Sequence, residues 1–387
     1  MKLSKRANRI QPSATIAVSA LAKELKAKGK PVLSFSAGEP DFTSPDAAMD
    51  AARAAIDRGE THYTANSGVP ELKKAVAGYY RKHFGLEYEN AEILVSSGAK
   101  PLVYQALQVL VDEADEVLLF SPAWVSYIEQ VNIAEGVPVI VDTADTGFVP
   151  TKAEVEKALS SKTVGMIVNS PNNPTGAVYD EATLRMLAEV AVKHDLWIIY
   201  DEIYERLVYG DTKHHNILEL VPEIRDRVIL INGVSKAFCM TGWRIGYALG
   251  PKDVIKKMDD IQSHLTSNAS SIAQWAAVGA IDGADADVER RRAMFETRRD
   301  LLYGLLSEVD GLRLVKPRGT FYAFFDVRGT ALPDDMAFCK RILEEEYVAL
   351  VPGTAFLAPG FIRMSYACSE DNIREGVARI RKFVESL

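Results

Sequence analysis

A single lysine, Lys236, lies in the stretch VILINGVSKAFCMTGWRIG, residues 228–246, among apolar and small residues. The pattern predicts a buried strand at 228–231, a turn at 232–235 and a second strand at 245–249. Lys236 would therefore follow the carboxyl end of a strand, where open α/β sheets bind ligands. Most lysines are solvated surface residues. An amine with apolar neighbours loses its proton more easily and can attack an aldehyde, so Lys236 is a candidate nucleophile.

The motif SKAFCMTGWRIGY, residues 235–247, resembles the lysine motif of the class I aminotransferases, which use pyridoxal 5′-phosphate. The resemblance covers essentially the whole chain and implies the α/β fold known as fold type I. It also implies that Lys236 binds the cofactor covalently and carries the proton of the substrate's α-carbon. Ser235 and Arg244 would bind the cofactor beside it, with Arg244 on the phosphate.

A second cluster of small residues, Gly98, Ala99 and Lys100, follows the predicted strand 93–97. These residues begin a helix that we expect to run to about Val111. A helix N-terminus offers free backbone amides and the positive end of the helix dipole to an anion. Many strand-to-helix turns carry such residues without binding a ligand. The resemblance implies that this segment binds the cofactor phosphate.

Two further motifs follow predicted strands. The loop 169–176, NSPNNPTG, contains Asn173, and the resemblance implies that this asparagine bonds the phenolic oxygen of the cofactor. Asp201 follows the predicted strand 196–200 and would by itself suit a helix cap. The resemblance instead pairs Asp201 with the ring nitrogen of the cofactor, which keeps that nitrogen protonated and the ring electron-withdrawing. Tyr204 would bond the phenolic oxygen beside Asn173.

Some candidates suit an ordinary structural role as well as a functional one. Trp124 suits core packing, whereas the resemblance implies that it stacks on the cofactor ring. Tyr63 suits half-buried packing, whereas its family counterpart is a catalytic-site residue that bonds the cofactor phosphate of the partner subunit. Tyr63 therefore implies a homodimer with active sites at the subunit interface. The substrate would contact Gly38, Lys100, Trp124, Asn173 and Arg363, and Arg363 would bind the α-carboxylate with two parallel hydrogen bonds.

The substrate class depends on Lys100. Animal and enteric aspartate aminotransferases bind the distal carboxylate with a second arginine from the neighbouring subunit, but the matching segment 264–275, HLTSNASSIAQW, has no arginine or lysine. A buried carboxylate would then lack a compensating charge. A bacterial subgroup, which this chain resembles through SSGAK and SPAWVSY, has a lysine at the position of Lys100. A purely solvating role suits Lys100 less, because a cation at a helix N-terminus opposes the dipole.

The sequence therefore predicts a ping-pong aminotransferase acting on L-aspartate and 2-oxoglutarate. The alternative is an aminotransferase of broader or different specificity, acting on prephenate and glutamate or on aromatic amino acids. Some relatives that accept prephenate carry a basic residue near the position of Gln11, and the glutamine counts against prephenate. A regulator of this fold without turnover would not need both Tyr63 and Arg363. A nicotinamide-linked dehydrogenase would need a GxGxxG motif after its first strand, which is lacking.

The composition is that of an ordinary globular protein, with 48% hydrophobic and 25% charged residues. The net charge of −8 argues against nucleic-acid binding, which needs a basic surface. The 3 cysteines lie far apart without a CxxC pair, which suggests neither a disulfide framework nor a metal site and fits a reducing cytoplasm. No segment approaches the ~20 apolar residues of a membrane span, and the N-terminus lacks the apolar stretch of a signal peptide.

Predicted strands and helices alternate through most of the chain, which is typical of a mostly parallel sheet wrapped by helices. We expect residues 46–284 to form this large cofactor-binding domain. Residues 1–45 would form an N-terminal arm, a helix from Ser13 to Lys28 and part of a small domain. Residues 285–387 would supply a solvated linking helix and the rest of the small α+β domain.

Overall fold

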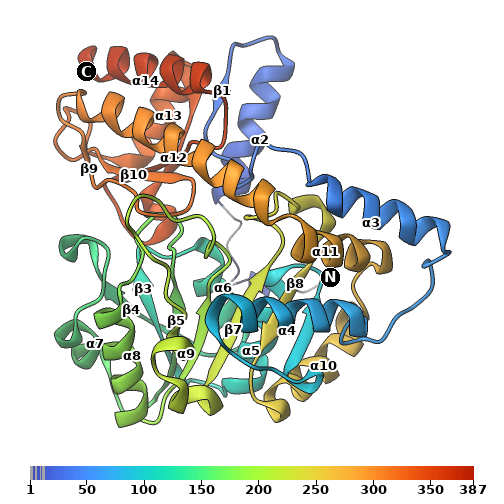
Figure 1. The fold of residues 1–387 in the computed structure, drawn as a ribbon. Coiled ribbons are helices and arrows are strands. Elements are labelled where there is room, and N and C mark those ends of the chain that lie inside the picture. Colours follow the sequence, from blue (N-terminus) through green and yellow to red (C-terminus); the bar gives the residue numbers. More distant parts are fainter. Residues whose placement is uncertain (1–2, 5–6, 9, 11–13) are drawn as a thin grey trace.

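The computed structural model describes residues 3–4, 7–8, 10 and 14–387, and a seven-stranded sheet is its main feature (Figure 1). The strands of this sheet are β2 (Ile93–Ser96), β3 (Glu116–Ser121), β4 (Val137–Asp142), β5 (Thr163–Asn169), β6 (Trp197–Asp201), β7 (Val228–Gly233) and β8 (Gly246–Leu249). Their order is β2-β8-β7-β6-β5-β3-β4. β8 runs antiparallel to both neighbours, and all other pairs are parallel. The prediction of a mostly parallel sheet is confirmed.

Both faces of this sheet are covered by helices, because successive strand residues point to opposite sides and both sets are apolar. In β6, for example, Ile198 and Tyr200 pack on one side and Ile199 on the other. The first side is covered by α3 (Asp46–Asp57), α4 (Pro70–Phe84), α8 (Glu181–Lys193), α9 (Ile217–Leu220) and α11 (Ser271–Gly283). The second side is covered by α5 (Ala99–Leu110), α6 (Val125–Ile133) and α10 (Lys252–Leu265), and α7 (Lys152–Ala158) contacts β4 and α8.

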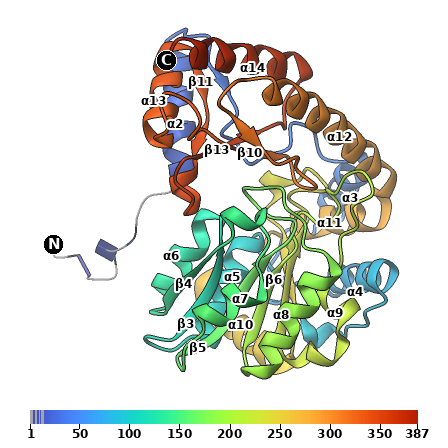
Figure 2. The ribbon, with the colours of Figure 1, turned by 90° about the vertical axis from the view of Figure 1, so that its left-hand side faces the viewer.

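Two smaller sheets lie together with the C-terminal helices (Figure 1). They contain β1 (Leu33–Ser34), β9 (Arg313–Leu314), β10 (Tyr322–Asp326), β11 (Val348–Ala349), β12 (Val351–Pro352) and β13 (Phe361–Ser365), and the helices are α2 (Ala14–Ala27), α13 (Asp335–Glu345) and α14 (Glu370–Glu385). One sheet is antiparallel in the order β12-β13-β10-β9, and β1 pairs in parallel with β11. Figure 2 shows α2, from the start of the chain, beside α13 and β11.

The long helix α12 (Asp285–Ser307) connects the two groups of elements (Figure 1). Its charged sequence predicts a solvated helix, and this prediction is wrong for one face, where Phe295 and Arg298 are buried. Arg298 donates hydrogen bonds of 2.7 and 2.9 Å to the carboxylate of Asp41. Phe42 packs edge-on against Phe295 with 5.3 Å between the ring centroids. Paired arginines can be buried because their stems are apolar and their charge is compensated.

We propose the division into residues 1–45, 46–284 and 285–387, and the separate apolar cores around the large and small sheets support it. Parts of the predicted arm, including Gln11 and Pro12, and the predicted helix start at Ser13 lie outside the described residues. Among the described helices, none is both long and apolar enough to cross a membrane. Short 3-10 helices complete the description: η1 (Asn90–Glu92), η2 (Ala144–Thr146), η3 (Pro222–Arg227), η4 (Thr241–Trp243) and η5 (Gly353–Phe356).

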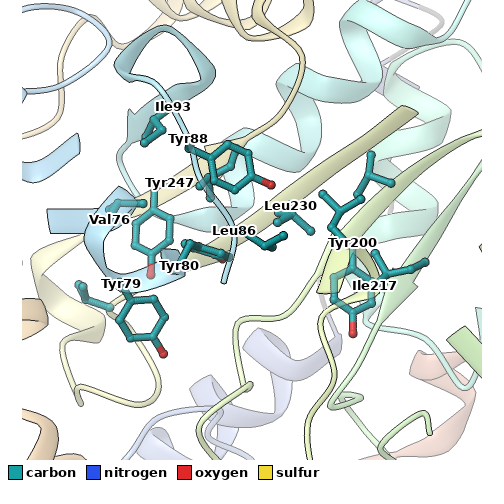
Figure 3. Close-up of a cluster of buried hydrophobic side chains, with 14 of the residues drawn as sticks. Val76, Tyr79, Tyr80, Leu86, Tyr88, Ile93, Tyr200, Ile217, Leu230 and Tyr247 are labelled. Atoms are coloured by element: carbon teal, nitrogen blue, oxygen red, sulfur yellow. The ribbon is translucent and has the colours of Figure 1, made fainter. Parts of the chain in front are cut away.

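Tyrosines make up a large part of the core on the first side of the main sheet (Figure 3). The buried rings are those of Tyr79, Tyr80, Tyr88, Tyr179, Tyr200 and Tyr247. Tyr80 meets Tyr88 and Tyr247 edge-on, with ring centroids 5.9 and 6.4 Å apart. A buried tyrosine hydroxyl needs a polar partner. The hydroxyl of Tyr80 accordingly donates to Glu202 at 2.6 Å, so this core contains carboxylates as well as rings.

Two helical glycines provide a matched test of the packing of the small sheets. A side chain at Gly376 in α14 would overlap the ring of Phe35, whose backbone is held by bonds to Ala349 and Ser365. Gly304 in α12 is exposed, with nothing within 4 Å of an added Cβ. We expect Gly376→Ala to lower the free energy of unfolding by about 1–3 kcal/mol through overpacking. Gly304→Ala should raise it by up to about 1 kcal/mol through helix propensity.

Urea unfolding of both variants measures these changes. An increase in stability for Gly376→Ala equal to that for Gly304→Ala would contradict the close packing of α14 on Phe35.

Candidate functional site

A cavity of about 690 Å³ lies where the carboxyl ends of the main-sheet strands face the smaller sheets. Both groups of elements contribute to its wall, because α5, β6 and the segment after β7 meet the segment after β1 and β13 there. The predicted site residues that line it are Gly38, Ala99, Lys100, Trp124, Asn173, Asp201, Tyr204, Ser235, Lys236, Arg244 and Arg363. The fold therefore brings together residues that are spread over most of the sequence.

Lys236 follows β7 by three residues and is half-buried. Its Nζ donates a hydrogen bond of 2.6 Å to the carbonyl oxygen of Gly38. Burial lowers the pKa of Lys236 to about 8, and the nearby charge of Arg363 acts in the same direction. A substantial fraction of the amine is therefore neutral near pH 8, which is the form that attacks a carbonyl carbon or accepts a proton.

Asp201 ends β6, is buried and lines the cavity. Its Oδ2 accepts a hydrogen bond of 2.7 Å from the hydroxyl of Tyr127, and its Oδ1 accepts one of 3.1 Å from the amide of Ile203. Burial raises the pKa of Asp201 to about 6, while these two bonds oppose the rise. Such a carboxylate binds a proton strongly and can share it with a basic ring nitrogen.

Arg363 reaches the cavity from β13 and is almost fully buried. Its Nη1 donates to Oδ1 of Asn173 at 3.1 Å, and its Nη2 donates to the carbonyl oxygen of Ser36 at 2.8 Å. Its Nε is buried without a hydrogen-bond partner among the described residues. Burial lowers the pKa of this guanidinium, which stacks over the ring of Tyr322 at 4.4 Å. A buried guanidinium with only neutral partners is suited to an anionic ligand.

Lys100, the second residue of α5, lines the cavity. Its Nζ is 4.7 Å from the ring centroid of Trp124, which is a cation–π distance. Partial burial lowers the pKa of Lys100, and the charge of Arg244 adds to this effect. No carboxylate bonds Lys100 in the described part of the chain, so a second cation faces the cavity from the large-sheet side.

The start of α5 packs tightly against Arg244 and β8. Gly98 has φ 101°, and a Cβ at this position would overlap the guanidinium of Arg244. A Cβ at Gly246 would overlap the amide of Ala99. Glycine is therefore needed at both positions for this approach. Gly98 itself lies behind Arg244, whereas Ala99 and Arg244 line the cavity.

Tyr63 is the one predicted site residue that lies far from these contacts. Its side chain is 92% exposed and does not line the cavity. The loop that carries it is nevertheless held in place, because Asn66 donates to the carbonyl oxygen of Asp259 at 3.0 Å and Gln274 donates to Thr64 at 3.1 Å. The described chain thus presents Tyr63 outward on an ordered loop.

Several cavity residues were missed by the sequence reasoning. Tyr322 bonds Tyr204, with 3.0 Å between the two hydroxyl oxygens, and Tyr127 bonds Asp201. Thr241 donates to Glu39 across the cavity wall. Three of these residues lie in motifs already recognised, which is a usable signal: Asn169 opens NSPNNPTG, Tyr127 ends SPAWVSY, and Thr241 lies in SKAFCMTGWRIGY. The other missed lining residues are Ser19, Ala20, Lys23, Ser36, Ala37, Ile203 and Gly242.

Comparisons with known proteins agree with one another. Residues 30–380 match the family described as Aminotransferase class I and II. The chain is 47% identical to the aspartate aminotransferase of Geobacillus stearothermophilus over 100% of both chains. It is 44% identical to the aspartate/prephenate aminotransferase of Thermus thermophilus over 98% of each chain. The solved aspartate aminotransferase from Thermus thermophilus with maleate has a TM-score of 0.95 and 43% identity over 99% of each chain. That of Rhizobium meliloti has a TM-score of 0.96 and 40% identity, covering 100% of this chain and 99% of that one.

The lowered pKa of Lys236 leads to a test on the protein without added ligand. The rate at which Lys236 forms an adduct with a small aldehyde, trapped by borohydride, should rise with pH and reach half its maximum at about pH 8. The rate rises because the neutral amine is the reacting form, and the lowered pKa makes it available well below the ordinary value of 10.5. Peptide mapping by mass spectrometry measures the adduct, and Lys236→Ala is the control. A half-maximum near pH 10.5 would rule out a desolvated amine.

Proposed function

The chain belongs to the class I and II aminotransferases, enzymes that use pyridoxal 5′-phosphate, and we propose that it transfers the amino group between L-aspartate and 2-oxoglutarate. The observation that carries this proposal is that Arg363, from β13, and Lys100, from α5, line the same cavity as Lys236. A dicarboxylic amino acid needs two such positive groups.

The residues of the cavity fit pyridoxal phosphate. The Lys236 amine, whose lowered pKa makes its neutral form available, suits the aldehyde of the cofactor. The carboxylate of Asp201 suits the ring nitrogen of the cofactor. At the other end of the site, Arg244 and the amide end of α5 suit its phosphate, and the glycines at 98 and 246 allow their close approach. We propose that Lys236, Asp201, Tyr204, Asn173 and Trp124 hold the cofactor with Gly98, Ala99, Lys100, Ser235 and Arg244. When bound, the cofactor supplies an electron sink for the electrons released at the substrate's α-carbon.

The protein groups then have separate tasks. Lys236, with its pKa near 8, would take the proton from the substrate's α-carbon and deliver it to C4′ of the cofactor, and it would move a proton the other way in the opposite half-reaction. Asp201 holds a proton at the cofactor's ring nitrogen, and Tyr127 keeps the carboxylate oriented. The same site serves both substrates in turn, so the kinetics are expected to be ping-pong.

We propose that Arg363 binds the α-carboxylate that every amino acid substrate carries. Its guanidinium is fixed by Asn173 and by the carbonyl oxygen of Ser36, which leaves the carboxylate a preformed place beside Gly38. Gly38 is required there, because a Cβ would overlap the hydroxyl of Tyr322. A preoriented fork of this kind binds a carboxylate more specifically than an ammonium group does.

Lys100 is our proposed ligand for the distal carboxylate of aspartate. It faces the cavity from the start of α5, and its side chain is kept beside Trp124. The relative from Thermus thermophilus was solved with maleate, which is a dicarboxylate. The similar aspartate/prephenate aminotransferase of Thermus thermophilus has prephenate in its name, so prephenate stays a second candidate acceptor.

The proposal also includes a homodimer. Tyr63 is exposed on an ordered loop and would reach the cofactor phosphate bound by a second copy of the chain, which gives a reason for exposing a large aromatic side chain. We further infer a cytoplasmic location, which the three free cysteines support because thiols stay reduced there.

A panel of amino donors and 2-oxo acid acceptors tests the activity. With pyridoxal phosphate, the purified protein should convert L-aspartate and 2-oxoglutarate to oxaloacetate and L-glutamate. The oxaloacetate formed is measured by its reduction with NADH in a coupled enzyme assay. Lys236→Ala should show no turnover, because it lacks the proton carrier. Prephenate, alanine and aromatic amino acids complete the panel. A higher kcat/KM for an aromatic amino acid than for aspartate would contradict the proposal that aspartate is the substrate.

Lys100→Ala should lower kcat/KM for aspartate and glutamate by about 10- to 100-fold, as expected from the loss of a charge-assisted hydrogen bond of roughly 1.4 to 2.7 kcal/mol. The value for alanine, which has no distal carboxylate, should change little. Lys252→Ala is a matched control, because Lys252 also begins a helix but lies outside the cavity. An equal loss for alanine and aspartate in Lys100→Ala would remove Lys100 from substrate recognition.

A further inference from the structure

The turn after β6 carries two carboxylates that face away from the cavity. Asp201 and Tyr204 line the cavity, whereas Glu202 and Glu205 are buried on the other side, against the tyrosine core of Figure 3. Glu202 has 0% of its side chain exposed. A buried carboxylate is costly unless it is fully hydrogen-bonded, so its presence directly behind Asp201 needs an explanation.

Glu202 is fully bonded by side chains from separate parts of the chain. Its Oε1 accepts hydrogen bonds from the hydroxyl of Tyr80 at 2.6 Å and from Nδ2 of Asn216 at 3.0 Å. Its Oε2 accepts from the same Asn216 nitrogen at 3.0 Å and is 2.9 Å from Nε2 of His214. Each carboxylate oxygen thus has two partners. These partners fix the orientation of the Glu202 carboxylate and, with it, the conformation of the turn that carries Glu202.

The same network joins the strand of Asp201 to the strand of Lys236. The amide of Glu202 donates to the carbonyl oxygen of Ile231 at 3.0 Å. Asn232, the next residue of β7, donates to the hydroxyl of Tyr80 at 3.5 Å and accepts from the amide of Gly233 at 2.7 Å. Lys236 follows three residues after Gly233. The ends of β6 and β7 are therefore fixed relative to each other on the side opposite the cavity.

Glu202 also acts on Asp201 through its charge. The pKa of Asp201 is raised mainly by burial, and the negative charge of Glu202 adds to the rise. The other titratable groups that interact with Glu202 include Tyr80 of α4, Tyr88, Tyr200 of β6, Tyr247 of β8, and Glu205 and His214 from the segment after β6, and Tyr79 and Arg206 lie beside Glu205. The negative charge of Glu202 therefore favours a proton at the Asp201 carboxylate, on the side that faces the cavity.

We propose that Glu202 is a positioning residue whose buried carboxylate, held by Tyr80, His214 and Asn216, fixes Asp201 against the cofactor's ring nitrogen and strengthens its hold on the proton there. This inference rests on the proposed use of pyridoxal phosphate but not on the identity of the amino acid. Glu202 touches neither the cavity nor the substrate, so its effect passes through Asp201.

Glu202→Gln tests the proposal in the holoenzyme. Glutamine keeps the size of the side chain, but it removes the charge and places an NH₂ group where an oxygen accepts hydrogen bonds. We expect kcat to fall by about tenfold or more, with KM for aspartate changed by less than about threefold. The midpoint of the pH titration of the bound cofactor's absorbance should fall by at least about half a unit, because protonated forms lose a favourable charge.

Glu205→Gln is the matched control. Glu205 lies in the same turn, is buried, and accepts a hydrogen bond from Tyr79. Burial raises its pKa to about 7, so a neutral glutamine resembles its protonated form. We expect its kcat and its absorbance midpoint to stay close to those of the wild type. An equal effect of both glutamine variants would reduce Glu202 to a general stabiliser of the core and overturn the proposal.

Tyr80→Phe keeps the test open if Glu202→Gln does not fold. This variant removes one donor and retains the ring, and its midpoint and kcat should move in the same directions by smaller amounts. If Glu202→Gln folds, an unchanged absorbance midpoint and an unchanged kcat in that variant would overturn the proposal. If it does not fold, the same result in Tyr80→Phe would overturn the proposal. The absorbance titration needs no amino acid. A shifted midpoint in a protein that does not act on aspartate would therefore refute the proposed substrate alone.

Discussion

The hydrogen bond from the Lys236 amine to the carbonyl oxygen of Gly38 joins the two parts of the molecule at the reactive atom. Lys236 follows a strand of the main sheet, and Gly38 follows the strand that enters the smaller sheets. The amine is desolvated because both parts close around it, and this desolvation lowers its pKa toward neutrality. The chemistry of the site thus depends on contact between segments that are 198 residues apart.

The parallel sheet sets the positions of the other groups. Asn169, Asp201 and Ile231 are paired in register across β5, β6 and β7, so the ends of these strands lie at one edge of the sheet. Because both faces are buried under helices, the strands cannot slide without exposing apolar side chains. The fixed ends of these strands hold the turn after β6 in place, so that Asp201 faces the cavity and Glu202 faces the tyrosine core.

The charges in the cavity are mainly positive. Its lining cations are Lys23, Lys100, Lys236, Arg244 and Arg363, and its lining carboxylates are Glu39 and Asp201. Burial lowers the pKa values of Lys100, Lys236 and Arg363, which shows that their charged forms are incompletely compensated within the chain. An anionic cofactor and the proposed dicarboxylic substrate would supply this compensation.

The sequence by itself determined the family, the alternating α/β architecture and the candidates Lys236, Asp201 and Asn173, because each lies in a short motif whose order along the chain is fixed. Only the tertiary structure decided which side chains meet them. Tyr127 ends the motif SPAWVSY and Tyr322 lies in none of the quoted motifs, but the sequence names the partner of neither, because their bonds to Asp201 and Tyr204 span 74 and 118 residues. The buried face of α12 was hidden by its charged sequence, because pairing and packing across the fold, rather than residue type, decide whether an arginine is buried.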